Sequence, residues 1–253
     1  MDIPIELIHS LSRASKIVVL TGAGMSAESG VPTFRDALTG LWEKYSTEEL
    51  ATPEAFLRNP QLVWQWYQER RKMVARAEPN SGHLALAEME RMLSGLTVVT
   101  QNVDGLHQVA GSHKVIELHG NIMASRCFDY GHHYQANLNN DDFWNVSEPP
   151  VCQNCGSLIR PTVVWFGEAL PEEALDSAWQ LISEADVVLS VGTSTLVQPA
   201  ASLPFEALSL GIPVVEINLH PTPLSDQAPF MLQGKSGEVL PQLLSTLKVG
   251  MKS

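Results

Sequence analysis

A short apolar run that ends at a pair of glycines constrains the fold of this chain more than any other feature of its sequence. Lys16–Leu20 is rich in β-branched residues, and Gly22 and Gly24 follow almost at once. This pattern predicts a buried strand that leads into a tight turn. Glycines allow backbone N–H groups to approach an anion, and a helix starting there would add the positive end of its dipole. The sequence therefore predicts a phosphate-binding turn after the first strand.

The spacing of this turn fits only part of the common dinucleotide-binding pattern. Gly22, Gly24 and Ala27 match its first half. No strand ending in Asp or Glu follows about twenty residues later, as the ordinary pattern requires. Arg35 instead provides a fixed positive charge suited to a pyrophosphate. A glycine pair alone also serves ordinary turns, so a functional interpretation depends on the longer run around it.

Length and composition favour an acidic globular protein with an ample core. A chain of 253 residues with 44% hydrophobic and 17% charged residues can form one α/β domain with a small satellite. A net charge of −12 argues against nucleic acid and anionic membranes as partners and favours basic ones such as lysine-bearing proteins, although many enzymes are acidic only to stay soluble. We find no secretory signal and no apolar run of membrane-spanning length, so we expect a cytoplasmic protein.

The longer run over residues 22–35 reads Gly-Ala-Gly-x-Ser-x-Glu-Ser-Gly-x-Pro-Thr-Phe-Arg. It resembles the NAD-binding signature of the sirtuins, the NAD-dependent protein lysine deacylases, and the resemblance extends over nearly the whole chain. It implies an α/β fold, a Rossmann-like doubly wound parallel sheet with a helical insert and a small inserted metal-ribbon module. We expect the NAD-binding domain at 1–35, 82–120 and 160–253, the helical insert at 36–81 and the zinc-ribbon-like module at 121–159.

Two residues are the candidates for catalysis. The strand Leu96–Thr100 is followed by polar residues, which lie in the ligand crevice when they follow a central strand of an open α/β sheet. Among the eight histidines, His119 alone ends a predicted strand, Val115–His119, before a glycine and matches a family motif, and imidazole has a suitable pKa for a base. His107, His113, His132, His133 and His220 remain competitors on sequence grounds. The sirtuin resemblance implies that His119 is the general base and that Asn102 orients the ribose and water.

The resemblance also implies a set of NAD-binding residues. They are Gly22, Ala23, Gly24, Ser26, Ala27, Glu28, Thr33, Phe34, Arg35, Trp42, Gln101, Asn102, Val103, Asp104, Gly192, Thr193, Ser194, Asn218, Leu219, His220 and Ser236. The loop after Arg35 departs slightly from the family pattern, being one residue longer and lacking a glycine.

A Tyr-x-x-Arg pair indicates the acyl group that is removed. Tyr67 and Arg70 would share one face of a helix and offer a hydroxyl and a guanidinium to one carboxylate. Periodicity alone favours a surface helix with solvated arginines. The pair nevertheless resembles the sirtuin subgroup that removes succinyl and malonyl groups, and Ala51 would leave room for the longer chain. Other substrate-binding residues that the resemblance implies are Val164, Phe166, Gly167 and Glu168, in a segment that pairs with the substrate peptide.

An incomplete cysteine set indicates a structural zinc site. Cys152 and Cys155 form a Cys-x-x-Cys-Gly half-site, and Cys127 provides a third thiolate. Tyr130 stands where the sirtuin pattern has a fourth cysteine. Asp129, His132 or His133 could supply the missing ligand, or the module could have lost zinc.

We therefore expect an NAD-dependent protein lysine deacylase that removes acetyl and also succinyl or malonyl groups and releases nicotinamide and O-acyl-ADP-ribose. Its substrates would be acylated lysines on proteins or peptides. An NAD glycohydrolase, a mono-ADP-ribosyltransferase and a non-catalytic NAD-sensing module remain the alternatives.

Overall fold

The computed structural model describes residues 3–32, 43, 45–135 and 144–251. The chain forms two compact units. Unit 1 comprises Met1–Gly30, Glu78–Leu118 and Pro171–Ser253, and unit 2 comprises Val31–Ala77 and His119–Leu170. Among the described helices, none combines the length and apolar character that crossing a bilayer requires.

Unit 1 is built on a parallel sheet in the order β3-β2-β1-β7-β8-β9. The strands, along the chain, are β1 (Ile17–Thr21), β2 (Leu96–Thr100), β3 (Val115–Glu117), β7 (Val187–Val191), β8 (Val214–Asn218) and β9 (Phe230–Gln233). Every residue of β1 and β7 is buried, because helices cover both faces of the sheet. This explains why both strands read as continuous apolar runs rather than as alternating ones.

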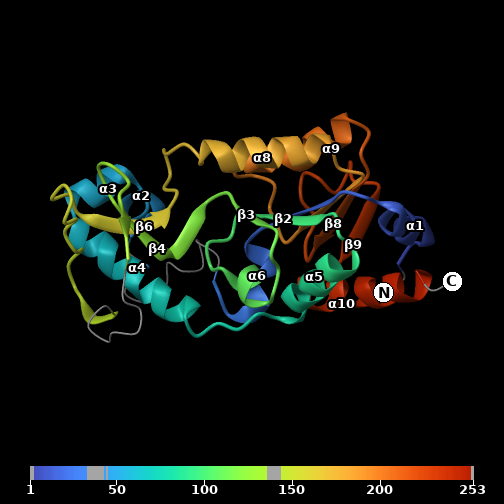
Figure 1. The fold of residues 1–253 in the computed structure, drawn as a ribbon, viewed down its shortest axis with the longest axis horizontal. Coiled ribbons are helices and arrows are strands. Elements are labelled where there is room, and N and C mark those ends of the chain that lie inside the picture. Colours follow the sequence, from blue (N-terminus) through green and yellow to red (C-terminus); the bar gives the residue numbers. More distant parts are fainter. Residues whose placement is uncertain (1–2, 33–42, 44, 136–143, 252–253) are drawn as a thin grey trace. The chain divides into compact units, whose positions relative to one another are not determined.

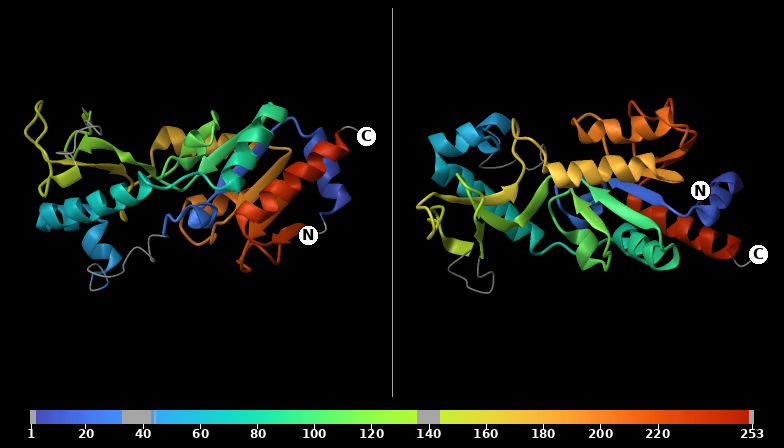
Figure 2. Two further views of the ribbon diagram at one scale, coloured as in Figure 1. Left: turned by 90° about the horizontal axis from the view of Figure 1, so that it is seen from below. Right: turned by 45° about the horizontal axis from the view of Figure 1, so that its top comes forward.

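The helices of unit 1 form two layers, one on each face of the sheet (Figures 1 and 2). One layer holds α1 (Ile5–Arg13), α5 (Ser81–Met92) and α10 (Ser236–Gly250), and the other holds α8 (Glu172–Ser183) and α9 (Leu203–Ser209). Short helices follow three of the strands. They are η1 (Ala23–Met25) and η2 (Ala27–Ser29) after β1, α6 (Leu106–Val109) after β2 and η4 (Ala200–Ser202) after β7. The prediction of a doubly wound parallel sheet is confirmed.

Unit 2 combines three helices with a small antiparallel sheet. The helices are α2 (Thr47–Leu50), α3 (Pro53–Arg58) and α4 (Pro60–Val74), and the sheet has the order β5-β4-β6, with β4 (Gly120–Cys127), β5 (His133–Tyr134) and β6 (Ile159–Val163). A single helical segment over 45–76 was the expectation. Each proline instead starts a new helix, and the preceding residue, Thr52 or Asn59, caps it through its side chain.

The division into units differs from the expected boundaries at residues 160–170. They were expected in the main domain, but β6 pairs with β4 in the small sheet, so this segment belongs to unit 2. Two apolar side chains expected to face inward are exposed, Ile5 on α1 and Leu84 on α5. Strand β9 was not predicted at all; it forms the edge of the large sheet beside β8.

Candidate functional site

The large sheet has the strand order of a dinucleotide-binding fold. Along the chain, β1, β2 and β3 extend the sheet in one direction and β7, β8 and β9 extend it in the other. The order therefore reverses between β1 and β7, and in open α/β sheets the ligand crevice lies at the carboxyl ends of the strands at this position. The loops beginning at Gly22 and Gly192 leave the sheet here, and both were predicted as cofactor-binding turns.

The glycines of these two loops are needed for contact between the loops. A Cβ at Gly24 would lie 2.7 Å from the Cα of Gly192, and one at Gly22 would lie 2.9 Å from the carbonyl oxygen of Gly192. The N–H groups of Gly22 and Gly24 donate to the carbonyls of Val191 (3.1 Å) and Gly192 (2.8 Å). The amides of Gly22 and Gly24 are therefore occupied by the neighbouring strand and loop, and a phosphate at this turn would have to be bound by other backbone N–H groups.

Other backbone donors remain for an anion in these loops. Within the part of the chain that the structure describes, the N–H groups of Ala23 and Ser194 have no hydrogen-bond acceptor. Both residues are exposed and both were predicted to bind the cofactor. Backbone N–H groups at the start of such loops commonly donate to phosphate oxygens, so the amides of Ala23 and Ser194 suit the phosphates of a dinucleotide, whereas those of Gly22 and Gly24 already have acceptors.

Asn102 is held rigidly at the end of β2. Its backbone N–H donates to Thr100 Oγ1 at 3.0 Å, and its side-chain Nδ2 donates to the Gly22 carbonyl and to Ser26 Oγ, each at 3.0 Å. Asn102 is 9% exposed and Ser26 is 1% exposed. With both amide protons used, the side-chain orientation is fixed and the oxygen of the amide is the group that remains to bind a ligand.

Asp104 lies two residues further on and is also buried. Its Oδ1 accepts the backbone N–H of Leu106 at 2.9 Å, which caps the short helix α6. Burial raises the pKa of this carboxyl group, while the hydrogen bond from Leu106 lowers it. A buried carboxyl group of raised pKa is typical of functional sites. Gln101 lies beside it and donates from Nε2 to Thr193 Oγ1 at 3.5 Å.

Two buried histidines lie near Ser26 and Thr21: His83, for which the sequence favours a packing or capping role, and His107, one of the competitors of His119. His83 Nδ1 accepts the N–H of Asn80 in a capping box, and its Nε2 lies 3.5 Å from Ser26 Oγ. His107 Nε2 lies 3.0 Å from Thr21 Oγ1, and the two rings have centroids 4.9 Å apart. Burial lowers the pKa of His83 to about 4 and, with the charge of His83 as a second cause, that of His107 to about 3. Both rings are therefore neutral near pH 7, and a pKa this far below the operating pH makes His107 a weak base, which disfavours it as the general base.

The loops after β7 and β8 are joined by Asn218. Its Nδ2 donates to the carbonyl of Thr193 at 2.8 Å, and its Oδ1 accepts the N–H of Leu219 at 2.9 Å. Leu219 and His220 are exposed beside it. At the start of α10, Glu28 Oε2 accepts the N–H of Gly237 at 2.7 Å. Ser236 is buried against the β1 loop. These contacts bring the predicted adenosine-side residues of unit 1 to the same edge of the sheet.

The remaining predicted NAD residues fall into two groups. Ala27 is exposed in η2, and Val103 is half-buried between Asn102 and Asp104. Thr33, Phe34, Arg35 and Trp42 lie outside the described residues.

His119 begins the second segment of unit 2, His119–Leu170, and is half-buried. It does not end a strand, as expected, but lies in a turn between β3 and β4. Its carbonyl accepts the N–H of Val164 at 2.9 Å, which places it beside the predicted peptide-binding segment. Gly120 has φ +75° and a Cβ there would lie 2.1 Å from the Thr162 carbonyl, so only glycine fits after His119.

The predicted substrate segment contains one exposed and one ion-paired side chain. Phe166 is 49% exposed, and its N–H donates to the carbonyl of Ala51 at 2.9 Å. Gly167 is exposed with φ +87°. Glu168 is bonded to the guanidinium of Arg160 through both oxygens, at 2.5 and 2.9 Å. Glu168 therefore has a structural role within unit 2.

Tyr67 and Arg70 are buried, not solvated as helix periodicity alone favoured. They are 2% and 8% exposed, and the Arg70 guanidinium lies 5.0 Å from the ring centroid of Trp66. Burial lowers the pKa of Arg70, and the neighbouring Tyr67 acts to raise it. Trp165, which the sequence did not distinguish from a core residue, donates from Nε1 to the Tyr67 hydroxyl at 2.9 Å. The next residue on α4, Arg71, is fully buried and bonds the carbonyls of Ile122 and Ala124.

The three cysteines converge with one histidine. The ligand atoms of Cys127, His132, Cys152 and Cys155 all lie within 4.8 Å of one another. His132 Nδ1 is 3.7 Å from Cys152 Sγ, and the thiols of Cys155 and Cys127 are 3.8 Å apart. Burial acts to raise the pKa of the Cys152 thiol, but hydrogen bonds involving Asn154, His132 and Cys155 lower it to about 6. Among the described residues, this group is the one that could hold a metal through His, Cys or acidic ligands. The three thiols and one imidazole are a donor set typical of structural zinc.

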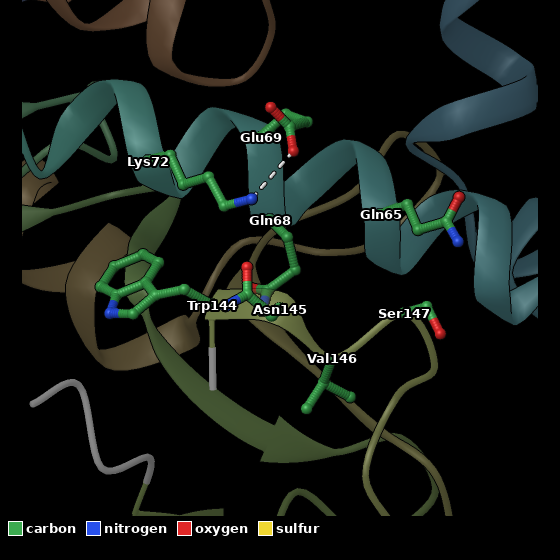
Figure 3. A pocket seen from close by; sticks show the side chains of 8 residues that line it. All are labelled: Gln65, Gln68, Glu69, Lys72, Trp144, Asn145, Val146 and Ser147. Carbon is green, nitrogen blue, oxygen red and sulfur yellow. Dashed lines mark hydrogen bonds and ion pairs between the residues drawn. The ribbon is translucent and has the colours of Figure 1, made fainter. Parts of the chain in front are cut away.

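Unit 2 also carries a polar hollow of about 180 Å³ beside α4 (Figure 3). Two of its lining residues, Lys72 and Glu69, form an ion pair at 3.1 Å along α4. The hollow contains none of the predicted site residues. Its lining is Gln65, Gln68, Glu69, Lys72, Trp144, Asn145, Val146 and Ser147.

The strand order and the contacts between the two glycine loops define a Rossmann-type dinucleotide-binding protein. Comparison with known proteins identifies the family within this class. The sequence model of the Sir2 family matches residues 22–199. An NAD-dependent protein deacylase of Pyrococcus furiosus is 51% identical over 244 residues, covering 96% of this chain and 97% of that protein. Another, from Aquifex aeolicus, is 50% identical over 235 residues, covering 92% of this chain and 95% of that protein.

Solved structures agree with these sequence comparisons. The crystal structure of a Sir2 homologue with NAD superposes with a TM-score of 0.91 at 43% identity, covering 99% of this chain and 96% of that one. A complex of Sir2, a p53 peptide and NAD⁺ has a TM-score of 0.84 at 34% identity, covering 96% and 98%. The chain belongs to the Sir2 family of NAD-dependent enzymes.

Proposed function

We propose that this chain is an NAD-dependent protein lysine deacylase. The observation that carries the proposal is Asn102, which Gly22 and Ser26 fix against the loop that leaves β1, where the strand order of the sheet reverses. Its remaining amide oxygen is suited to a ribose hydroxyl or a water molecule in the ligand crevice. Relatives of about this length that are named NAD-dependent protein deacylases support the same activity.

The groups present at this crevice fit NAD. Ala23 and Ser194 offer backbone N–H groups to the phosphates, and Asn218 and Ser236 lie on the predicted adenosine side. Asp104 is suited to accept a hydrogen bond from a carboxamide such as that of nicotinamide. When bound, NAD would supply a ribose carbon that loses nicotinamide and takes up the acyl oxygen. Water would then add at the acyl carbon and displace the lysine amine, so the products would be nicotinamide, free lysine and O-acyl-ADP-ribose.

His119 is proposed as the general base that removes a proton from a ribose hydroxyl. The turn that holds it is fixed by the bond from Val164 and by the fit of Gly120 against Thr162. Imidazole is the side chain whose ordinary pKa suits this proton transfer. The backbone of 164–167, beside it, would pair with the extended substrate peptide.

The acyl preference is proposed from the buried pair on α4. Tyr67 and Arg70 provide a phenol and a guanidinium in surroundings of low polarity, where a charge-assisted bond to a carboxylate is strong. A buried cation of lowered pKa is stabilised most by an anionic partner. We therefore propose that succinyl- and malonyl-lysine are preferred over acetyl-lysine.

The test replaces the guanidinium alone. Arg70→Met keeps a long apolar side chain and should lower kcat/KM for a succinyl peptide by about 10- to 100-fold, while that for the acetyl peptide changes less than about threefold. Arg76→Met, at an exposed position just after the same helix, is the matched control and should change neither. Equal losses on both peptides in Arg70→Met would contradict the acyl preference and leave the deacylase proposal standing.

We also propose that Cys127, His132, Cys152 and Cys155 bind one structural zinc ion. His132 then takes the role for which Asp129 and His133 were the other candidates. The ligands lie close enough together in unit 2 for tetrahedral coordination, and the metal would stabilise the turns of the small sheet.

A further inference from the structure

The direction of one buried hydrogen bond carries information about the substrate. Trp165 Nε1 donates to the Tyr67 hydroxyl at 2.9 Å. An indole N–H can only donate, whereas a phenol both accepts and donates. The bond therefore uses a lone pair of the Tyr67 oxygen and leaves its proton for another acceptor. In the part of the chain that the structure describes, no such acceptor lies within hydrogen-bond distance.

The indole is held by contacts that leave it little freedom. The backbone N–H of Trp165 donates to Glu168 Oε2 at 2.7 Å, and the Arg160 guanidinium lies 3.3 Å from the ring centroid. Arg160 is in turn fixed by two bonds to Glu168 and one to the carbonyl of Val163. Phe56 packs against the same ring, with centroids 5.3 Å apart. These contacts fix the ring so that its indole N–H points at the Tyr67 hydroxyl.

The Tyr67 hydroxyl keeps its proton near neutral pH and so remains a hydrogen-bond donor. It is 2% exposed, and burial raises its pKa to about 12 although Arg70 acts to lower it. A buried O–H without an acceptor costs about 1–3 kcal/mol. An acyl chain with an oxygen acceptor at its far end would remove that cost, whereas an acetyl group has no such oxygen.

We infer that Trp165 is a positioning residue for acyl specificity, which fixes the Tyr67 hydroxyl as a donor to the distal carboxylate of the acyl-lysine. The inference rests on the proposed acyl preference. It adds that the substrate must present an acceptor to Tyr67, and that the Arg160–Glu168 pair acts on specificity through Trp165.

The test removes the N–H and keeps the ring. Trp165 is replaced by β-(3-benzothienyl)alanine, which has the same bicyclic shape and no donor, and separately by Phe. With a succinyl peptide, kcat/KM should fall about three- to tenfold, mainly through a higher KM, as expected for one neutral hydrogen bond. With an acetyl peptide it should stay within about twofold of the unmodified enzyme. Trp179→Phe, in unit 1, is the control and should change neither.

A double-mutant cycle distinguishes positioning from packing. If Trp165 acts through Tyr67, the benzothienyl replacement should cause no further loss in a Tyr67→Phe background. An equal loss on both peptides, the same loss in that background, or no loss on the succinyl peptide would each overturn the inference. Failure of the acyl preference itself would give different results. The unmodified enzyme would then show no higher kcat/KM for the succinyl peptide than for the acetyl peptide, and Tyr67→Phe would have the same kcat/KM as the unmodified enzyme.

Discussion

Gly24 has no room for a side chain, and the reason is the neighbouring loop. Its hypothetical Cβ would contact the backbone of Gly192, which cannot rotate away as a flexible side chain could. Such overpacking costs about 1–3 kcal/mol. Gly24→Ala should therefore lower the free energy of unfolding by about this amount and weaken NAD binding, because the two loops must separate. Urea unfolding and calorimetric titration with NAD measure both effects, and a variant with normal stability and affinity would contradict the proposed contact.

The buried histidines make stability depend on pH. In the folded chain the pKa of His107 is about 3, against 6.5 for an ordinary histidine. Below pH 6.5 the unfolded chain takes up a proton that the folded chain does not, so stability is complete above this pH and is lost as the pH falls toward 3. Between pH 7 and 5 the loss for one such group is about 2 kcal/mol.

The variant His107→Gln tests this account. Its amide can still donate to Thr21 Oγ1 but takes up no proton. The free energy of unfolding should fall by about 2 kcal/mol less between pH 7 and 5 in the variant than in the wild type, as measured by urea unfolding at both values. An identical decrease in both proteins would show that His107 is not the titrating group.

The sequence identified candidate site residues but not the contacts that hold them in place. The glycine turn was found from its spacing, but its amides bond the neighbouring strand and loop, a contact between residues about 170 positions apart that no local pattern encodes. Trp165 was missed because a buried indole in an apolar segment looks like a core residue. Only its hydrogen bond to Tyr67 distinguishes it.

At the scale of elements, the parallel sheet was predictable and the small antiparallel sheet was not. Apart from β9, which was not predicted, the strands of unit 1 are apolar runs separated by helices or polar loops, so each leaves a local signal. In unit 2, β4 pairs with β6 across more than thirty residues and through an irregularity between Asn121 and Ser125. Its half-buried residues do not alternate cleanly. The cysteine spacing predicted a module here, but not that 160–170 belongs to it.

The zinc proposal is tested on the turn between β4 and β5. Purified protein should contain about one equivalent of zinc, His132→Ala should lose most of it, and His133→Ala should keep it, because the neighbouring imidazole lies outside the ligand cluster. Metal analysis gives these contents directly. Less than about a tenth of an equivalent in the wild type, or equal contents in the two variants, would remove the metal assignment.

For the whole molecule, the central claim is that nicotinamide release and lysine deacylation are one reaction. The most direct measurement follows both products with succinyl and acetyl peptides, with and without NAD. We expect one nicotinamide for each lysine released, no nicotinamide without an acyl peptide, and a loss of more than about 100-fold in a folded His119→Ala variant. Nicotinamide released at the same rate without peptide would instead indicate a glycohydrolase and contradict the account.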